Sequence, residues 1–203
     1  MIIKNWICKL AICIILMIIT CAQAQGANIT VDGNINDWVG ISPIVTDPQD
    51  SLFGDILDAY VTDNGSYLFF RVDLLDLSLL GAQYILNIDI DVNQDNITDY
   101  IISSNSSKAL LLDASNLDLI DYCQIGVNNT VEIAVPLYEI GNPTSVNLVF
   151  STSAFLNYPL DRAPDTGYVT YVVTTPQPPI PELPVMVLSA LGVAIIALYR
   201  FLK

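Results

Sequence analysis

The stretch "AYVTDNGSYLFFRVDL", Ala59 to Leu74, decides the fold class, because it contains two alternating runs joined by a tight turn. Asn64-Gly65 between two such runs is a strong local signal for a β-hairpin, since both residues tolerate the positive φ that the turn requires. In the second run every other side chain is apolar, which predicts a strand with one face in a core. The predicted core-facing residues are Leu68, Phe70, Val72 and Leu74.

Further short runs of the same kind follow along the chain. They are "YILNIDID", "YIISS", "ALLLDA", "LIDYCQIGV", "TVEIAV", "SVNLVFST" and "GYVTYVV". Roughly nine to eleven strands without a long amphipathic helix are typical of an all-β protein. Residues 25–174 are therefore predicted to form one domain, an antiparallel two-sheet sandwich of the jelly-roll kind.

Both ends of the chain carry segments of a different composition. Residues 1–24 have the order of basic residues, apolar run and small "AQA" that is typical of a secretory signal peptide. A lipidated Cys21 is the alternative, which the preceding Thr20 disfavours. Residues 175–184 form a proline-rich linker, and residues 185–203 are predicted as a transmembrane helix with a basic tail. The domain is therefore expected at the extracellular face of the cell membrane, anchored through its C-terminus.

The short motif Pro181, Glu182 and Leu183, between the prolines and the apolar helix, resembles archaeal PEF-CTERM sorting tails. That resemblance implies processing by an archaeosortase, a membrane protease-transpeptidase. The sequence departs from the family pattern because Leu183 stands where the motif has phenylalanine, and only one arginine follows the helix directly. A plain transmembrane anchor is the alternative, and both imply attachment to the cell surface.

The composition of the exported part excludes several functions. Between residues 25 and 180 there are 20 acidic and three basic residues, so 3 − 20 gives a net charge of −17. This charge repels nucleic acid and favours divalent cations. The chain has no histidine, which excludes Ser-His-Asp and Cys-His catalysis and the usual zinc sites. Cys123 remains alone after signal cleavage and is predicted to be a small buried hydrophobe.

The segment "DIDVNQDNITDY", residues 89–100, predicts a structural calcium site. Asp91, Asn93 and Asp95 have the every-second-residue spacing with which calcium loops surround an ion. Asn96 takes the place of the usual glycine, and Ile102 stands where an EF-hand has glutamate, so the loop resembles the shorter loops of dockerin-like and thrombospondin-repeat proteins. A solvated hairpin turn is the alternative. The predicted ligands are Asp89, Asp91, Asn93, Asp95 and Asp99.

Two other groups of residues bear on surface chemistry. A second acidic group has irregular spacing, which favours a charged loop over another metal site, and it consists of Asp47, Asp50, Asp55 and Asp58. Five glycosylation sequons, most of them near predicted turns, begin at Asn28, Asn64, Asn96, Asn105 and Asn128.

The order of motifs along the domain gives a second resemblance. Four segments, taken in order, together resemble family-9 carbohydrate-binding modules and DOMON-like sandwiches. They are "ITVDGNINDWVGISPIVTDPQD" at residues 29–50, residues 58–74, "VEIAVPLYEIG" and "DRAPDTGYVTYVV". The resemblance implies an extracellular β-sandwich, often with structural calcium, that binds sugars through aromatic side chains. The mature chain has a single tryptophan, Trp38, at the place of a structural aromatic in that pattern.

Three classes of function are compatible with this sequence. The first is a non-catalytic surface protein with an adhesion, envelope or ligand-binding role, which contacts the membrane and a surface-protein or carbohydrate ligand. The second is a carbohydrate-binding module, and the third is a small glycoside-active enzyme with paired carboxylates. Glu132 on the outer face of a strand and Glu139 in a turn are predicted to be solvated, and no insertion builds a cleft. The first class is therefore preferred.

Overall fold

The computed structural model describes residues 28–154 and 158–174, and within them the chain is all-β with antiparallel pairing, as predicted. The strands are β1 (Val45–Thr46), β2 (Ile56–Asp63), β3 (Tyr67–Leu74), β4 (Tyr84–Asp91), β5 (Tyr100–Ser104), β6 (Ala109–Asp113), β7 (Leu119–Val127), β8 (Val131–Pro136), β9 (Ser145–Ala154), β10 (Tyr158–Ala163) and β11 (Val169–Val172). Three short 3-10 helices are η1 (Ile35–Trp38), η2 (Leu77–Leu79) and η3 (Leu137–Ile140).

The predicted signal peptide, proline-rich linker and C-terminal helix, residues 1–24, 175–184 and 185–203, lie outside the described residues. Across residues 28–154 and 158–174, no helix is long and apolar enough to cross a membrane.

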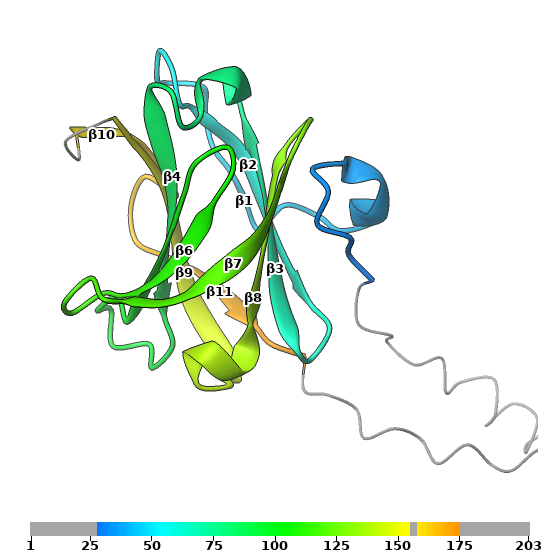
Figure 1. Ribbon diagram of the computed structural model, residues 1–203, viewed down its shortest axis with the longest axis vertical. Helices are drawn as coiled ribbons and strands as arrows, with labels where there is room; N and C mark the ends of the chain where they lie inside the picture. Colours follow the sequence, from blue (N-terminus) through cyan, green and yellow to red (C-terminus); the bar gives the residue numbers. More distant parts are fainter. Residues whose placement is uncertain (1–27, 155–157, 175–203) are drawn as a thin grey trace, which may run out of the picture.

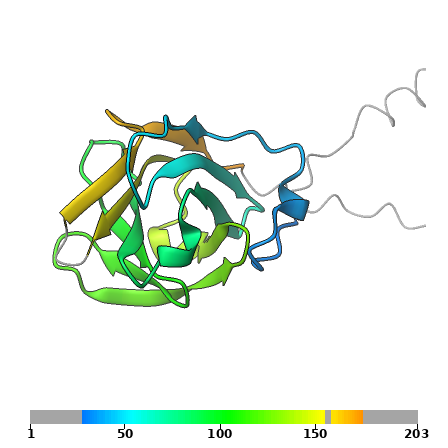
Figure 2. The same cartoon turned by 90° about the horizontal axis from the view of Figure 1, so that it is seen from above.

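The strands form one continuous sheet in the order β1-β2-β3-β8-β7-β6-β5-β4-β9-β10, and β11 also pairs with β9. We call β1, β2, β3 and β8 sheet A, and β6, β5, β4, β9, β10 and β11 sheet B. Strand β7 belongs to both, because its first half pairs with β6 and its second half with β8. In Figures 1 and 2 the strands surround the core from all sides. The two predicted sheets are thus joined by β7, whose pairing partner changes from β6 to β8 between Cys123 and Gln124.

The hydrophobic core is formed by the apolar residues that the alternation along β3 and β4 predicts to face inward. The core-facing residues of β3 and β4 are all at most 8% exposed, and they are Leu68, Phe70, Val72, Leu74, Tyr84, Leu86, Ile88 and Ile90. Phe70 of sheet A contacts Phe150 of sheet B edge to face, with ring centroids 6.3 Å apart. Cys123 is also buried, as predicted, and burial raises the pKa of its thiol to about 12. Each buried large apolar side chain contributes roughly 1.5–3 kcal/mol, so this core holds the two sheets together.

The predicted hairpin is confirmed, because β2 and β3 pair from Ile56 opposite Leu74 to Asp63 opposite Leu68. Gly65 in the turn has φ 77°, which is the left-handed conformation that the Asn-Gly signal implies. The Asn64 side-chain oxygen accepts hydrogen bonds from the backbone N–H groups of Ser66 and Tyr67. The turn is thereby closed by side chain and backbone together.

The N-terminal segment, residues 28–41, covers the outer face of sheet A beside β3 and β8 (Figure 1). A second apolar cluster forms there from Ile29, Trp38, Phe69 and Ala134. Trp38 is 2% exposed, so its side chain is packed inside this cluster. Gly126 lets the segment come close, because an added Cβ would lie 2.7 Å from the backbone nitrogens of Asp32 and Gly33.

The prediction that Glu132 is solvated is wrong. This residue lies on the outer face of β8, as expected, but it is completely buried rather than solvated, because the N-terminal segment covers it. One carboxylate oxygen accepts hydrogen bonds from the backbone N–H groups of Asp32 and Gly33, both at 2.8 Å. The other accepts a 2.7 Å hydrogen bond from Trp38 Nε1. Glu132 is therefore a structural residue that fixes the N-terminal segment.

The two ends of the continuous sheet meet at a seam, which we define as residues 47–56 after β1 and residues 158–163 of β10. No backbone ladder joins the two ends within the described residues. Instead, Ile56 N–H donates to an Asp161 oxygen at 2.6 Å, and the Ser51 hydroxyl donates to the Leu160 carbonyl oxygen at 3.2 Å. Side chains, and acidic ones above all, therefore close the seam.

Candidate metal centre

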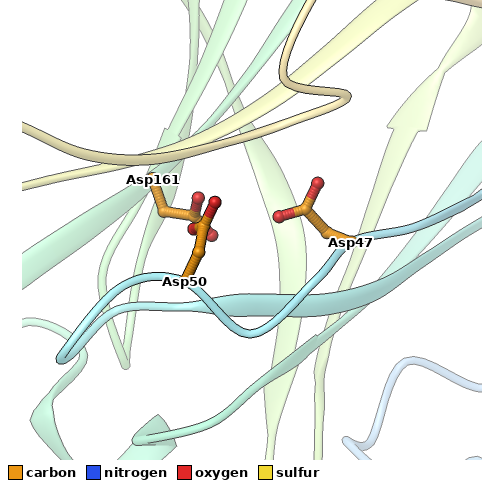
Figure 3. Close-up of side chains that lie close together, drawn as sticks. All are labelled: Asp47, Asp50 and Asp161. Carbon is orange, nitrogen blue, oxygen red and sulfur yellow. The ribbon is translucent and has the colours of Figure 1, made fainter.

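Three aspartates from different segments meet at the seam. Asp47 follows β1, Asp50 lies in the loop before β2, and Asp161 comes from β10. One carboxylate oxygen from each lies within 4.8 Å of the others, and Figure 3 shows the three side chains pointing toward one another. Oxygens bound to one calcium ion lie about 2.3–2.6 Å from it, so they can be up to about 5 Å apart. The spacing of the three aspartates fits a single ion.

Two buried oxygens at the seam have no hydrogen-bond partner among the described residues, Asp47 Oδ2 and Asp55 Oδ2. Asp47 is only 7% exposed, and Asp55 is completely buried. Buried polar atoms of native proteins nearly always have a partner, and an unpaired one carries a large desolvation cost. An ion at the seam would supply a partner to the Asp47 oxygen.

Asp55 also shapes the loop that carries Asp50. Its other oxygen accepts hydrogen bonds from the backbone N–H groups of Asp50 and Ser51, at 3.0 and 2.6 Å. These bonds fold the loop back on itself and hold Asp50 beside the start of β2. Asp58, the fourth member of the acidic group recognised in the sequence, is separate, because it accepts a hydrogen bond from the Thr46 hydroxyl at 2.6 Å.

The charge at the seam is not balanced by a basic side chain. The only salt bridge among the described residues joins Arg71 and Asp73 on β3. Burial raises the pKa of Asp47 to about 6, and the negative charges of Asp161 and other nearby aspartates add to the rise. Burial also raises the pKa of Asp161, although the N–H groups of Ile56 and Arg162 oppose it. A bound cation would relieve this repulsion.

The pKa of Asp47 predicts how the metal-free protein responds to pH. The folded value of about 6 lies above the ordinary 3.8, so the folded state holds this proton more tightly than the unfolded chain. Stability is therefore expected to fall as the pH rises from about 4 to above 6, by about 2–3 kcal/mol for this group alone. Thermal unfolding from pH 4.5 to 7.5, after calcium is removed on a chelating resin, measures it.

Asp47→Asn is the matched variant for this pH experiment. It removes the charge and keeps the side-chain shape, so the metal-free variant is expected to exceed the unmodified protein in stability at pH 7.5, and this difference is expected to shrink as the pH falls toward the ordinary pKa of 3.8. If the two stability curves run parallel across this range, Asp47 has an ordinary pKa in the fold, and the electrostatic argument for a cation fails.

The predicted calcium loop has a different geometry. Asp91 accepts hydrogen bonds from Gln94 and Asn96 N–H groups at 2.6 and 2.9 Å, and Asp99 accepts one from Val92 N–H at 2.9 Å. Asn93 and Asp95 likewise accept bonds from nearby backbone N–H groups. Within the described residues, no three of the loop's carboxylates lie within 4.8 Å of one another. The oxygens thus cap the backbone of the turn.

Asn96 has φ 69°, the left-handed conformation predicted for its place in the loop. Calcium binding by the loop stays a prediction. Asp89, the first of its predicted ligands, lies apart on the outer face of β4 and lines a groove there.

The predicted glycosylation sites lie at the surface. Asn28, Asn64, Asn96 and Asn128 are exposed, and Asn105 is half-buried. Their occupancy by glycans stays a prediction.

A comparison with models of protein families finds no match to this chain, and a comparison with curated proteins finds none either. The resemblances to carbohydrate-binding modules and to sorting tails therefore remain predictions from sequence. The geometry of the seam is the strongest functional observation in the described part of the chain.

Proposed function

We propose that this protein is a non-catalytic, calcium-stabilised β-sandwich displayed on the outer face of the cell membrane, with an adhesion, envelope or ligand-binding role. The observation that carries the proposal is the convergence of Asp47, Asp50 and Asp161 at the seam, together with the unpaired buried oxygen of Asp47. An ion bound there would join the loop after β1 to β10. It would close the sheet where no backbone ladder does so.

Calcium suits this set of residues better than other common ions. The donors are carboxylate oxygens only, whereas zinc prefers nitrogen and sulfur ligands. Calcium takes six to eight oxygens in flexible geometry, while magnesium requires a near-ideal octahedron and keeps most of its waters. The three aspartates come from separate segments, and backbone carbonyls or water would complete the shell. Display on the cell surface rests on the predicted signal peptide and C-terminal anchor.

Two observations support a role without catalysis or aromatic sugar stacking. Glu132 is completely buried with both oxygens hydrogen-bonded, so it is not placed to meet a substrate. Trp38, the tryptophan that a sugar-binding face would use, is 2% exposed. The exposed tyrosines belong to separate parts of the fold, and they are Tyr122, Tyr138, Tyr158 and Tyr168.

The proposal predicts calcium-dependent stability that depends on the seam. Calcium at about a hundred times its dissociation constant is expected to raise the free energy of unfolding by about 2.7 kcal/mol. Asp47→Asn combined with Asp161→Asn is expected to abolish this gain, because it removes two ligands. Thermal unfolding at pH 7.5 with calcium and with a chelator measures the effect.

The matched control carries Asp91→Asn and Asp95→Asn, which change the net charge by the same amount in the predicted calcium loop. It is expected to keep the calcium response. Loss of the response in the control alone would place the ion in the loop and contradict the seam site. If calcium changes the stability of neither the unmodified protein nor the control, the calcium proposal is wrong.

A further inference from the structure

The outer face of sheet B carries a groove of about 370 Å³ that lies over β5, β4 and β9 and reaches β10. The groove does not include the three aspartates Asp47, Asp50 and Asp161, although Pro159 of the seam also lines it. The groove combines a polar floor, a single carboxylate and aliphatic walls. This combination defines the chemistry of a ligand.

The polar floor of the groove is formed by residues that lie opposite one another on three neighbouring strands. Asn87 of β4 lies opposite Ser103 of β5 on one side and opposite Ser151 of β9 on the other. Asn87 also donates a hydrogen bond to the Ser153 hydroxyl at 3.2 Å. The row therefore presents hydroxyl and amide oxygens, which accept hydrogen bonds from a donor in the groove.

Asp89 follows Asn87 on the same face and is half-buried in the groove. Its carboxylate accepts no hydrogen bond from any described residue, although burial raises its pKa. The charge of Arg162 acts in the opposite direction, but its guanidinium donates its hydrogen bonds to the Pro164 and Gly167 carbonyl oxygens. Asp89 is thus a partly desolvated carboxylate that faces the groove and accepts no hydrogen bond from the described residues.

The walls are aliphatic and include a strained residue. Ile101 and Leu112 line the groove, and Leu117 in the turn after β6 lies at its edge. Leu117 has φ 63° and is 63% exposed. A left-handed conformation is unfavourable for a bulky L-residue, and the Leu117 N–H bond to the Asp113 carbonyl oxygen at 2.8 Å helps to hold it. Such strain gathers at functional sites.

We propose that the groove binds a primary alkylammonium group, with the ammonium on Asp89 and its carbon chain along the aliphatic walls. An ammonium has three N–H donors, which match the Asp89 carboxylate and the oxygens of the floor. The methylenes of the ligand pack on Ile101, Leu112 and Leu117. The net charge of −17 concentrates such cations near the surface. Among the described residues, no aromatic side chain lines the groove.

The same chemistry comes from two sources, a lysine side chain of a partner protein or a free polyamine. The purified protein, in buffer that contains calcium, is titrated with spermidine in one arm and with a short lysine-containing peptide in the other. The heat of binding is measured by isothermal titration calorimetry. Saturable 1:1 binding is expected in at least one arm, and the arm that binds identifies the source. The same peptide with acetylated lysine is expected not to bind, because acetylation removes the charge.

Two variants test the named residues. Asp89→Asn is expected to weaken binding at least tenfold, whereas Asp118→Asn, which changes an exposed aspartate by the same charge, leaves it unchanged. Leu117→Gly removes a wall and relieves the positive φ, so binding is expected to weaken severalfold without a lower unfolding temperature. Equal weakening by Asp89→Asn and Asp118→Asn, or no saturable binding of either probe, overturns the proposal. The calcium response of each variant is measured alongside and does not depend on this groove.

Discussion

Replacing Glu132 by alanine is expected to lower the free energy of unfolding by about 3–5 kcal/mol. The side chain is completely buried, and its removal leaves the N–H groups of Asp32 and Gly33 and the Trp38 indole N–H without their acceptor. Burial raises the pKa of Glu132 and its three donors lower it, with burial the larger effect. The loss of stability therefore comes chiefly from the orphaned donors and the cavity. Urea unfolding measures it.

A double-mutant cycle with Trp38 separates these causes. Glu132→Gln keeps the side-chain shape. When the amide oxygen of the glutamine accepts the hydrogen bonds from the two backbone N–H groups, its NH₂ group points at the indole N–H of Trp38, and two donors then face each other. Trp38→Phe removes that donor, so Glu132→Gln is expected to cost less in the Trp38→Phe background than alone. Additive costs would contradict the hydrogen-bond account. Asp118→Asn serves as the charge control and is expected to stay within about 0.5 kcal/mol of the unmodified protein.

The fold class could be predicted because its signals are local. Alternation of apolar and polar residues over Tyr67–Leu74 shows which face of β3 enters the core, and Asn64-Gly65 marks the turn before it. Both depend on residues that are close in the sequence. The burial of Cys123 follows from its residue type, a small hydrophobe on a predicted strand. Local signals of this kind do not depend on how distant strands are arranged.

Features that depend on distant segments could not be predicted in the same way. Alternation correctly placed Glu132 on the outer face of β8, but only the folded chain shows that residues 28–41 cover that face. The role of β7 in both sheets likewise depends on its two partners, β6 and β8. A periodic pattern shows which residues share a face and does not show what covers the face.

The candidate metal site illustrates the same limit. Regular spacing of oxygen ligands pointed to residues 89–100, where the structure shows side chains that cap the turn. The irregular spacing of Asp47 and Asp50 favoured a charged loop over a metal site. Their spacing gives no sign of the third member of the site, Asp161, because it comes from β10 at the other end of the sheet. The available signal was compositional: a large excess of aspartate over basic residues implies that some carboxylates have no protein partner.

Replacing Asp63 by alanine is expected to lower the free energy of unfolding by about 3–4 kcal/mol, because this buried carboxylate joins the β2–β3 turn to Tyr171 and Thr174. It accepts hydrogen bonds from Gly65 N–H at 2.9 Å in the β2–β3 turn and from the Tyr171 hydroxyl at 2.7 Å. It also accepts two from Thr174, from the backbone N–H at 2.9 Å and from the hydroxyl at 2.5 Å. Alanine leaves all these donors without an acceptor, and urea unfolding measures the cost.

The position of Asp63 gives this prediction a local signature. β11 is held in sheet B by pairing with β9, while Asp63 ties its end to sheet A. In Asp63→Ala, hydrogen exchange is therefore expected to rise first in residues 169–174 and to leave β4 protected. Tyr171→Phe removes one donor without orphaning another, so it is expected to cost only about 1 kcal/mol. A uniform rise in exchange would contradict a local tie.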